Sequence, residues 1–165
     1  MAKERPAFKG LLWQHSQYYS FFRPNDWHEF QWTDGHEGVI FGPDADDPLT
    51  VFAVELSDLG MTTTPDDHDD LDAGFMDGIR HLPGSEIDEH ETWVQGSIIC
   101  LAAKYTYLDD GIRRKRWVRA FYQDNRQIVM TAQGATVEAY DYWLPMFYEC
   151  MMTTKIHRFA PQTPY

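Results

Sequence analysis

The segment from Glu86 to Gly134 constrains the fold most, because extended runs rich in β-branched and aromatic residues alternate there with short turns. The turns are expected at Gln95-Gly96, Asp110-Gly111 and Asp124-Asn125. Asp-Gly between two strand-like runs is a strong hairpin signal, since both central residues tolerate a positive φ angle. The pattern therefore predicts an antiparallel meander.

A two-residue turn at Asp110-Gly111 also fixes which residues face each other across the hairpin. Tyr107 then lies opposite Arg114, and Tyr105 lies opposite Arg116. All four side chains share one face, so the guanidinium groups can lie over the tyrosine rings. Such a contact contributes about 0.5–1 kcal/mol at an exposed site.

The same hairpin contains a dense basic run, in a chain whose formal net charge is −12. Alternation along a strand sends successive side chains to opposite faces, so the run does not form one cationic stripe. Charged residues near a strand end are usual, which favours a structural role for most of the run. A docking site for a partner is the alternative. The basic residues are Arg113, Arg114, Lys115, Arg116 and Arg119.

Shorter runs before the meander predict further strands and one helix. The strands are expected at 18–22, 28–32, 38–43 and 49–57. Thr64 suits a helix N-cap and Pro65 suits the first helical position. Apolar residues then recur at helical spacing as far as Leu82, and Pro83-Gly84 ends the helix.

A second helix is predicted after the meander, over 135–152. Pro145 is expected to kink it or to begin another helix, because proline cannot donate to the preceding turn. Residues 1–17 read as an N-terminal extension, and residues 157–165 read as a loose tail. No repeat or linker divides the chain, so residues 1–165 are expected to form a single domain.

Charge and composition narrow the class of partner. Fourteen basic residues against 26 acidic ones disfavour a nucleic-acid binder and adsorption to anionic membranes. No stretch is apolar over the roughly 20 residues that a membrane span needs. The N-terminus has no apolar signal segment, and two cysteines make no disulfide framework, so a cytoplasmic location is expected.

Motifs for catalysis or cofactor binding are weak in this sequence. Cys100 and Cys150 lie in apolar runs and resemble small core residues more than activated thiols. The sequence has no phosphate-binding glycine loop and no nucleophile elbow, and we expect no cofactor. A divalent-cation or small-ligand site is the alternative, at the acidic loop and helix start: Asp44, Asp46, Asp66 and His68.

Three sequence motifs resemble the PsbP-like family, whose members include the photosystem II protein PsbP, a Ran-binding nuclear-transport factor and bacterial effector chaperones. They are "YSFFRPNDW", "VQGSIICLAAKYTYLDDG", and "RQIVMTAQG" followed by "AYDYWLPMFYECMMTTKI". The resemblance covers about Tyr18 to Ile156. It implies an α+β fold, an α/β/α sandwich with a central antiparallel sheet of about six or seven strands and flanking helices.

The resemblance also implies a non-enzymatic function, because members of this family generally act by binding proteins. We therefore expect an adaptor or chaperone-like module with a protein partner and no enzymatic activity. A homodimer through a sheet face or edge is a further possibility. The expected docking surface combines the hairpin end with an aromatic residue near the first turn: Trp27, Tyr105, Tyr107, Arg114 and Arg116.

Overall fold

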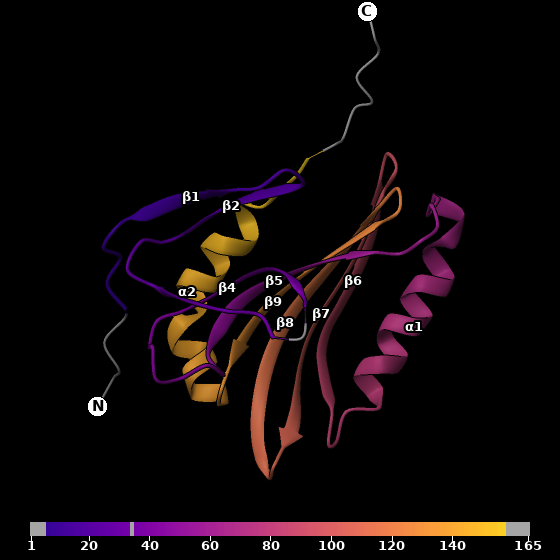
Figure 1. Cartoon of the computed structure of the whole chain (residues 1–165). Helices are drawn as coiled ribbons and strands as arrows, with labels where there is room; N and C mark the ends of the chain where they lie inside the picture. The colour runs from indigo at the N-terminus through magenta and orange to yellow at the C-terminus, as the bar shows by residue number, and fades with distance from the viewer. Residues whose placement is uncertain (1–5, 34, 158–165) are drawn as a thin grey trace, which may run out of the picture.

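The computed structural model describes residues 6–33 and 35–157, which form three layers (Figure 1). The middle layer is a seven-stranded sheet. Helix α1 (His68–Arg80), preceded by a 3-10 turn at Pro65–Asp67, covers one face. Helix α2 (Val137–Met152) and a three-stranded sheet cover the other. The fold is therefore the α+β sandwich that the sequence predicts.

The larger sheet has the strand order β3-β4-β5-β9-β8-β7-β6, and every neighbouring pair is antiparallel. Consecutive strands lie side by side except at β5, which pairs with β9 after the helix and the meander. The strands are β3 (His28–Phe30), β4 (Glu37–Gly42), β5 (Val51–Asp58), β6 (Glu86–Gln95), β7 (Ile98–Asp109), β8 (Ile112–Gln123) and β9 (Arg126–Gly134).

The meander β6 to β9 has the predicted register at its central hairpin. Asp109 pairs with Ile112, so Asp110 and Gly111 are the two turn residues, with φ angles of 53° and 77°. The turn between β6 and β7 lies one residue later than expected. Gln95 pairs with Ile98 there, which makes Gly96 the first central residue, at a φ angle of 61°. This glycine takes a backbone conformation that other residues rarely adopt.

Helix α1 begins as its acidic first turn predicts. The Asp67 carboxylate accepts a hydrogen bond of 2.8 Å from the Thr64 backbone N–H, which is half of a capping box. Met76 and Ile79 are buried, and they pack on Tyr105 and its neighbours in β7 and β8. Helix α1 therefore lies over the β6–β8 end of the sheet, on one face only (Figure 1).

Helix α2 runs through Pro145 without ending, so no second helix begins at this proline. The lost hydrogen bond is offset by apolar packing on both sides of the proline, since Tyr140 and Phe147 are almost fully buried. At the N-terminus, the Thr136 hydroxyl accepts from the Ala139 N–H at 3.1 Å. The buried residues of α2 are Tyr140, Met146, Phe147, Cys150 and Met151.

The three-stranded sheet was not predicted. It consists of β1 (Leu11–His15), β2 (Tyr19–Pro24) and β10 (Lys155–Ile156), with β2 in the centre. Part of the expected N-terminal extension is thus an ordered strand. In the expected tail, the His157 N–H donates to the Tyr18 carbonyl at 2.8 Å, and residues 158–165 lie outside the described part.

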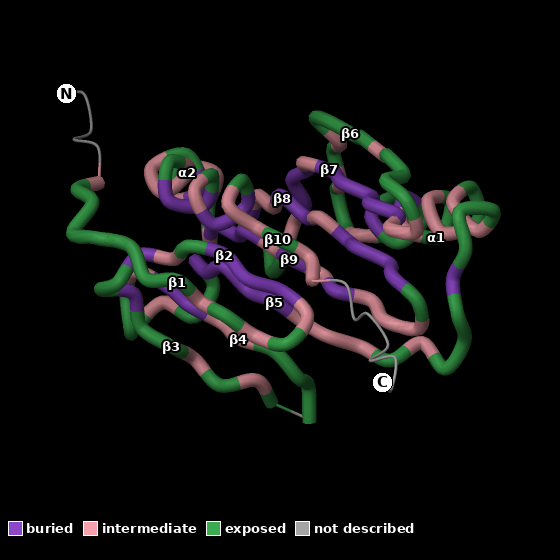
Figure 2. The backbone as a smooth tube through the Cα atoms, turned by 90° about the horizontal axis from the view of Figure 1, so that it is seen from above, coloured by how far each residue is buried: buried purple, intermediate pink, exposed green. Residues whose placement is uncertain are grey.

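Burial concentrates between the layers, as Figure 2 shows along β2, β5, β8 and β9. Phe21 of β2 and Phe52 of β5 are fully buried, with ring centroids 5.0 Å apart, and they join the small sheet to the large one. The strands at the two ends of the large sheet, β3 and β6, are mostly exposed (Figure 2).

Candidate functional site

Four of the five residues expected at a docking surface lie on the α1 side of the larger sheet. Tyr105 and Tyr107 are only 4% and 5% exposed, and both belong to the core under α1. The Arg116 guanidinium lies 4.4 Å from the centre of the ring of Tyr107, its diagonal neighbour, rather than over Tyr105 directly opposite, and its Nε donates to the Gln133 Oε1 atom. The contacts of these side chains link β7, β8 and β9.

Arg114 and Trp27 are also internal. Arg114 donates to the Asp109 carboxylate at 2.8 Å and to the Ala135 carbonyl at 2.7 Å, and it is 6% exposed. Trp27 lies on the opposite face of the sheet, where its ring meets Phe147 edge-on at 5.8 Å. The structure therefore does not bring the five residues together into one exposed surface. The turn after β2 directs Trp27 inward, onto α2.

The remaining cations of the basic run also have partners within the chain. Arg113 donates to the Thr106 hydroxyl and to the Gly84 carbonyl, both at 3.0 Å. The Lys115 ammonium lies 3.9 Å from Asp141. These contacts indicate that the basic run stabilises the fold, which agrees with the structural role that strand alternation favours.

An open surface lies instead on the α2 side of β6. Helix α2 packs over β8, β9 and β2, and its core includes the fully buried Cys100 of β7, whereas the residues of β6 on this side, from Glu89 to Gln95, stay exposed. A groove lies here, between β6 and the C-terminal end of α2. This α2 groove is lined by Glu89, Glu91, Trp93, Gln95, Gly96, Ile98, Ala102, Ala103, Lys104, Trp117, Arg119, Phe121, Tyr148, Met152, Thr154, Lys155 and Ile156.

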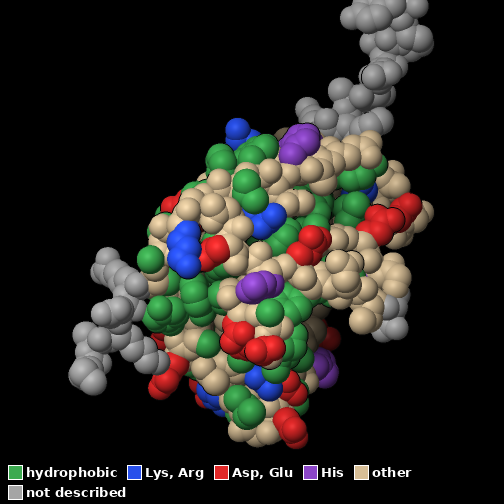
Figure 3. All heavy atoms as spheres, turned by 60° about the vertical axis from the view of Figure 1, so that its left-hand side comes forward, with side chains coloured by type: hydrophobic (Ala, Val, Ile, Leu, Met, Phe, Trp, Pro, Cys, Tyr) green, Lys and Arg blue, Asp and Glu red, His purple; other side chains and the backbone are tan. Residues whose placement is uncertain are grey.

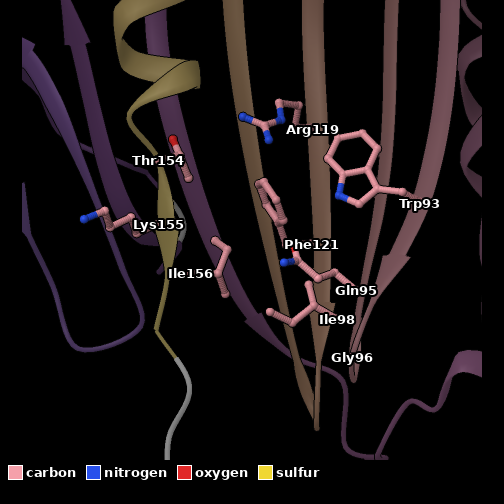
Figure 4. Close-up of a pocket in the computed structure, with 9 residues that line it drawn as sticks. All are labelled: Trp93, Gln95, Gly96, Ile98, Arg119, Phe121, Thr154, Lys155 and Ile156. Atoms are coloured by element: carbon pink, nitrogen blue, oxygen red, sulfur yellow. The ribbon is translucent and has the colours of Figure 1, made fainter.

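Two hollows make up the α2 groove. The first measures about 600 Å³ and lies between the β6–β7 turn and β10 (Figure 4). The second measures about 220 Å³ and lies between β6 and the last two turns of α2. Ala102 forms part of its floor, and its small side chain leaves the space open. The first hollow is large enough for a substantial side chain or a small ligand.

Arg119 stands at the centre of the α2 groove. In Figure 4 its guanidinium lies above Phe121 and beside Trp93, with ring centres 4.9 Å and 5.6 Å away. Its Nη1 donates to the Met151 carbonyl at 2.6 Å, so a cation holds the C-terminal end of α2 against the sheet. This contact keeps the wall of the groove in place.

Large apolar side chains are exposed along the α2 groove and beyond it. Trp93, Tyr148 and Met152 are 37%, 54% and 48% exposed. Trp13 and Phe22 of the small sheet flank Met152 on its other side, across a further hollow of about 450 Å³. Figure 3 shows hydrophobic side chains at the surface on the side of the molecule where β1 lies, interspersed with charged ones. Exposed apolar surface next to hollows is typical of interaction sites.

The far end of the α2 groove is ionic. The Lys104 ammonium lies 3.2 Å from Glu89 and 4.7 Å from the centre of the Trp117 ring. Lys115 lies 4.0 Å from Asp88. The groove thus changes from charged near Glu89 to aromatic near Trp93.

The acidic residues considered for a cation do not form a site. The Asp44 carboxylate accepts from the Asp46 N–H at 2.9 Å, which closes the loop before β5. His68 pairs with its neighbour Asp69 at 3.0 Å, at the start of α1. Across residues 6–33 and 35–157, no three His, Cys, Asp or Glu side chains are placed to hold a metal ion.

Both cysteines lie in the core, as their apolar surroundings predict. Burial raises the pKa of the Cys100 thiol to about 12, although Arg119 beside it acts in the opposite direction. Burial also raises the pKa of the Cys150 thiol. Neither thiol is activated for nucleophilic chemistry.

Comparison with solved structures identifies the fold, whereas no family model and no curated protein matches the sequence. Cyanobacterial PsbP (CyanoP) from Synechocystis sp. PCC 6803 superimposes with a TM-score of 0.61 at 14% identity, covering 95% of this chain and 98% of that one. The chain has a PsbP-like fold. The resemblance seen in the sequence motifs is thereby confirmed at the level of structure.

Two further structures share the PsbP-like fold. LpqN of Mycobacterium tuberculosis, described as involved in cell envelope biogenesis, has a TM-score of 0.63 at 13% identity, over 90% of this chain and 91% of its own. PA94 of Pseudomonas aeruginosa, a protein of unknown function described as a putative regulator, has a TM-score of 0.59 at 14% identity, over 91% and 99%. At such identities the likeness shows the fold and no site residue.

Within the described residues, neither helix is long and apolar enough to cross a membrane. The lining of the α2 groove comes from β6, β7, β8, α2 and β10, so the sequence alone does not bring these residues together. The one signal is the tryptophans, since Trp27, Trp93 and Trp117 can be interpreted either as groove residues or as core residues. Trp93 and Trp117 line the groove, whereas Trp27 packs in the core.

Proposed function

We propose that this chain is a non-enzymatic, chaperone-like module that binds a segment of a partner protein in the α2 groove. The observation that carries the proposal is the uncovered sheet face beside α2. Trp93, Tyr148 and Met152 leave a third or more of their surface in water there, next to hollows of about 600 and 220 Å³. Aromatic residues and methionine are enriched in protein interfaces.

The chemistry of the α2 groove supports a protein segment as the ligand. It combines an aromatic end around Arg119 with a charged end around Glu89, and a polypeptide can present matching apolar and charged side chains in sequence. Among neighbours with the PsbP-like fold, one is described as a putative regulator and one as involved in cell envelope biogenesis. Neither description is that of an enzyme.

Affinity purification with matched variants tests the proposal. The bait carries Tyr148→Ala and Met152→Ala, which truncate two exposed side chains on the groove wall. The control bait carries Met61→Ala, because Met61 is 66% exposed in the segment before α1 and remote in sequence from the groove. We expect the wild type and the control to recover the same partner, and the groove variant to lose it. Equal recovery by all three baits would refute the assignment of the groove.

A further inference from the structure

Strand β6 is a long, unpaired edge of the larger sheet. The strand order ends at β6, which has 10 residues and pairs with β7 alone within the described chain. Alternate residues of an edge strand direct their N–H and C=O groups away from the sheet. The opposite edge, β3, has only 3 residues. Strand β6 therefore offers the longer template for an added strand.

The usable part of this edge lies directly beside the α2 groove. The register with β7 is irregular between Ile87 and Glu89, and it is unbroken from Glu89 to Gln95. Glu89, Glu91, Trp93 and Gln95 all line the groove, as alternation along the strand requires. A strand laid against β6 would be about 4.8 Å away, so every second side chain of that strand would reach over the groove.

The charge of β6 selects the kind of strand that can bind. Its side chains include four carboxylates and no lysine or arginine, in the sequence "EIDEHETWVQ". Glu86, Asp88 and Glu89 remain 73%, 51% and 56% exposed, although cations of β7 and β8 lie 3.2–4.0 Å away. A second copy pairing through this edge would set carboxylates against carboxylates. Like charges opposite each other destabilise a strand pair, whereas a basic segment is favoured.

We propose that β6 binds an extended, basic segment of a partner protein as an additional strand of the sheet. A basic side chain of that segment lies next to Glu91, and an apolar one lies over Trp93 in the larger hollow. The inference rests on the proposed function and specifies its ligand. Backbone hydrogen bonds supply affinity in this mode of recognition, and the alternate side chains supply specificity.

Selection from a random peptide library displayed on phage, with the wild-type protein as bait, tests the inference. Enrichment of peptides with a basic and an apolar residue two positions apart, so that both can face the groove, and whose binding is lost on Trp93→Ala, is the expected result. Enriched peptides that are acidic or have helical periodicity, but still require Trp93, would overturn the edge-strand inference and leave the groove assignment standing. Failure to enrich any peptide that depends on Trp93 would overturn both.

Two backbone-methylated versions of the best basic peptide test strand pairing directly. One carries N-methyl groups on the odd residues and the other on the even residues, so each blocks one edge of the bound strand. We expect one version to bind about tenfold or more weakly, since it loses several hydrogen bonds, and the other to bind like the parent. Equal binding of both versions would overturn the inference.

A charge variant of β6 tests the electrostatic part. Glu91→Gln is expected to weaken binding of the same peptide about two- to fivefold, the range for an exposed ion pair. Glu29→Gln, on the opposite edge strand β3, makes the same change of charge and is expected to leave binding unchanged. Equal effects of the two variants would show that net charge alone attracts the peptide, and would overturn the inference.

Discussion

Removing the Arg119 side chain is expected to destabilise the protein more than removing an exposed cation would. Arg119 donates to the Met151 carbonyl at 2.6 Å, and its guanidinium lies over Phe121 and Trp93. The substitution Arg119→Ala leaves this carbonyl, at the C-terminal end of α2, without its cationic partner. It also detaches the α2 wall of the groove from β8.

The magnitude follows from these contacts. A hydrogen bond from a charged donor contributes about 1.5–3 kcal/mol, and the stacking on aromatic rings adds about 0.5–1 kcal/mol. We therefore expect Arg119→Ala to lower the free energy of unfolding by about 2–4 kcal/mol. Arg119→Lys keeps the charge near the negative end of the helix but lacks the planar fork, so about half of that loss is expected.

Urea unfolding at neutral pH, followed by circular dichroism, measures the free energy of unfolding for each variant. The control is Arg80→Ala, because Arg80 is also a cation in the last turn of a helix but is exposed. Its loss is expected to stay below about 0.5 kcal/mol. Hydrogen exchange should also accelerate in the last turn of α2 for Arg119→Ala only. Equal losses in the free energy of unfolding for Arg119→Ala and Arg80→Ala would show that Arg119 does not hold α2 against β8.

Three further predictions concern the core and pH. Gly134→Ala should cost about 2–3 kcal/mol in thermal or urea unfolding, because its Cβ would lie 2.4 Å from the Tyr140 backbone nitrogen; wild-type stability would contradict this packing. Cys100 should resist iodoacetamide at pH 8 in the folded protein and react in denaturant, as mass spectrometry would show, since it is 0% exposed and its pKa is raised to about 12; rapid native labelling would contradict the buried site. Burial, together with His15 and Lys155, lowers the pKa of His157 below 6.5 in the folded protein. As pH drops through 6.5, the unfolded chain therefore binds a proton at this histidine before the folded protein does, and the free energy of unfolding should fall. The urea midpoint of His157→Gln should fall less than that of the wild type between pH 7.5 and pH 5.5; parallel falls would contradict the assignment.

Local signals were sufficient to predict the meander and both helices. Asp110-Gly111 set the hairpin register, so the pairing of Tyr107 with Arg114 could be written down from the sequence. Thr64 and Pro83-Gly84 marked the limits of the first helix. These features depend on residues close in the chain, where turn and capping chemistry determines the conformation.

Strands that form only by pairing with segments distant in the sequence were not predicted. The strand Leu11–His15 forms because β2 lies beside it, and β10 is a two-residue pairing with the same strand. Neither segment has a pattern that identifies a strand without its neighbour. Pro145 does not start a second helix, since packing of Phe147 and Tyr140 outweighs the hydrogen bond that the proline removes.

The candidate site was the least predictable part. Trp27, Tyr105 and Tyr107 were assigned to a docking surface together with the cations at the hairpin end, and all three are buried. Burial depends on which sheet face each helix covers, and the sequence does not state this. The α2 groove exists because α1 and α2 cover different parts of opposite faces, leaving Trp93 exposed between them.

Site-specific photocrosslinking in cells tests whether the α2 groove binds a partner protein. A benzoylphenylalanine residue replaces Trp93 or Tyr148 in the α2 groove, or Met61 as an exposed position outside it. The two groove positions are expected to yield the same crosslinked protein on irradiation, and position 61 is expected to yield none. Crosslinks at position 61 alone, or different proteins at the two groove positions, would contradict the proposed function of the groove.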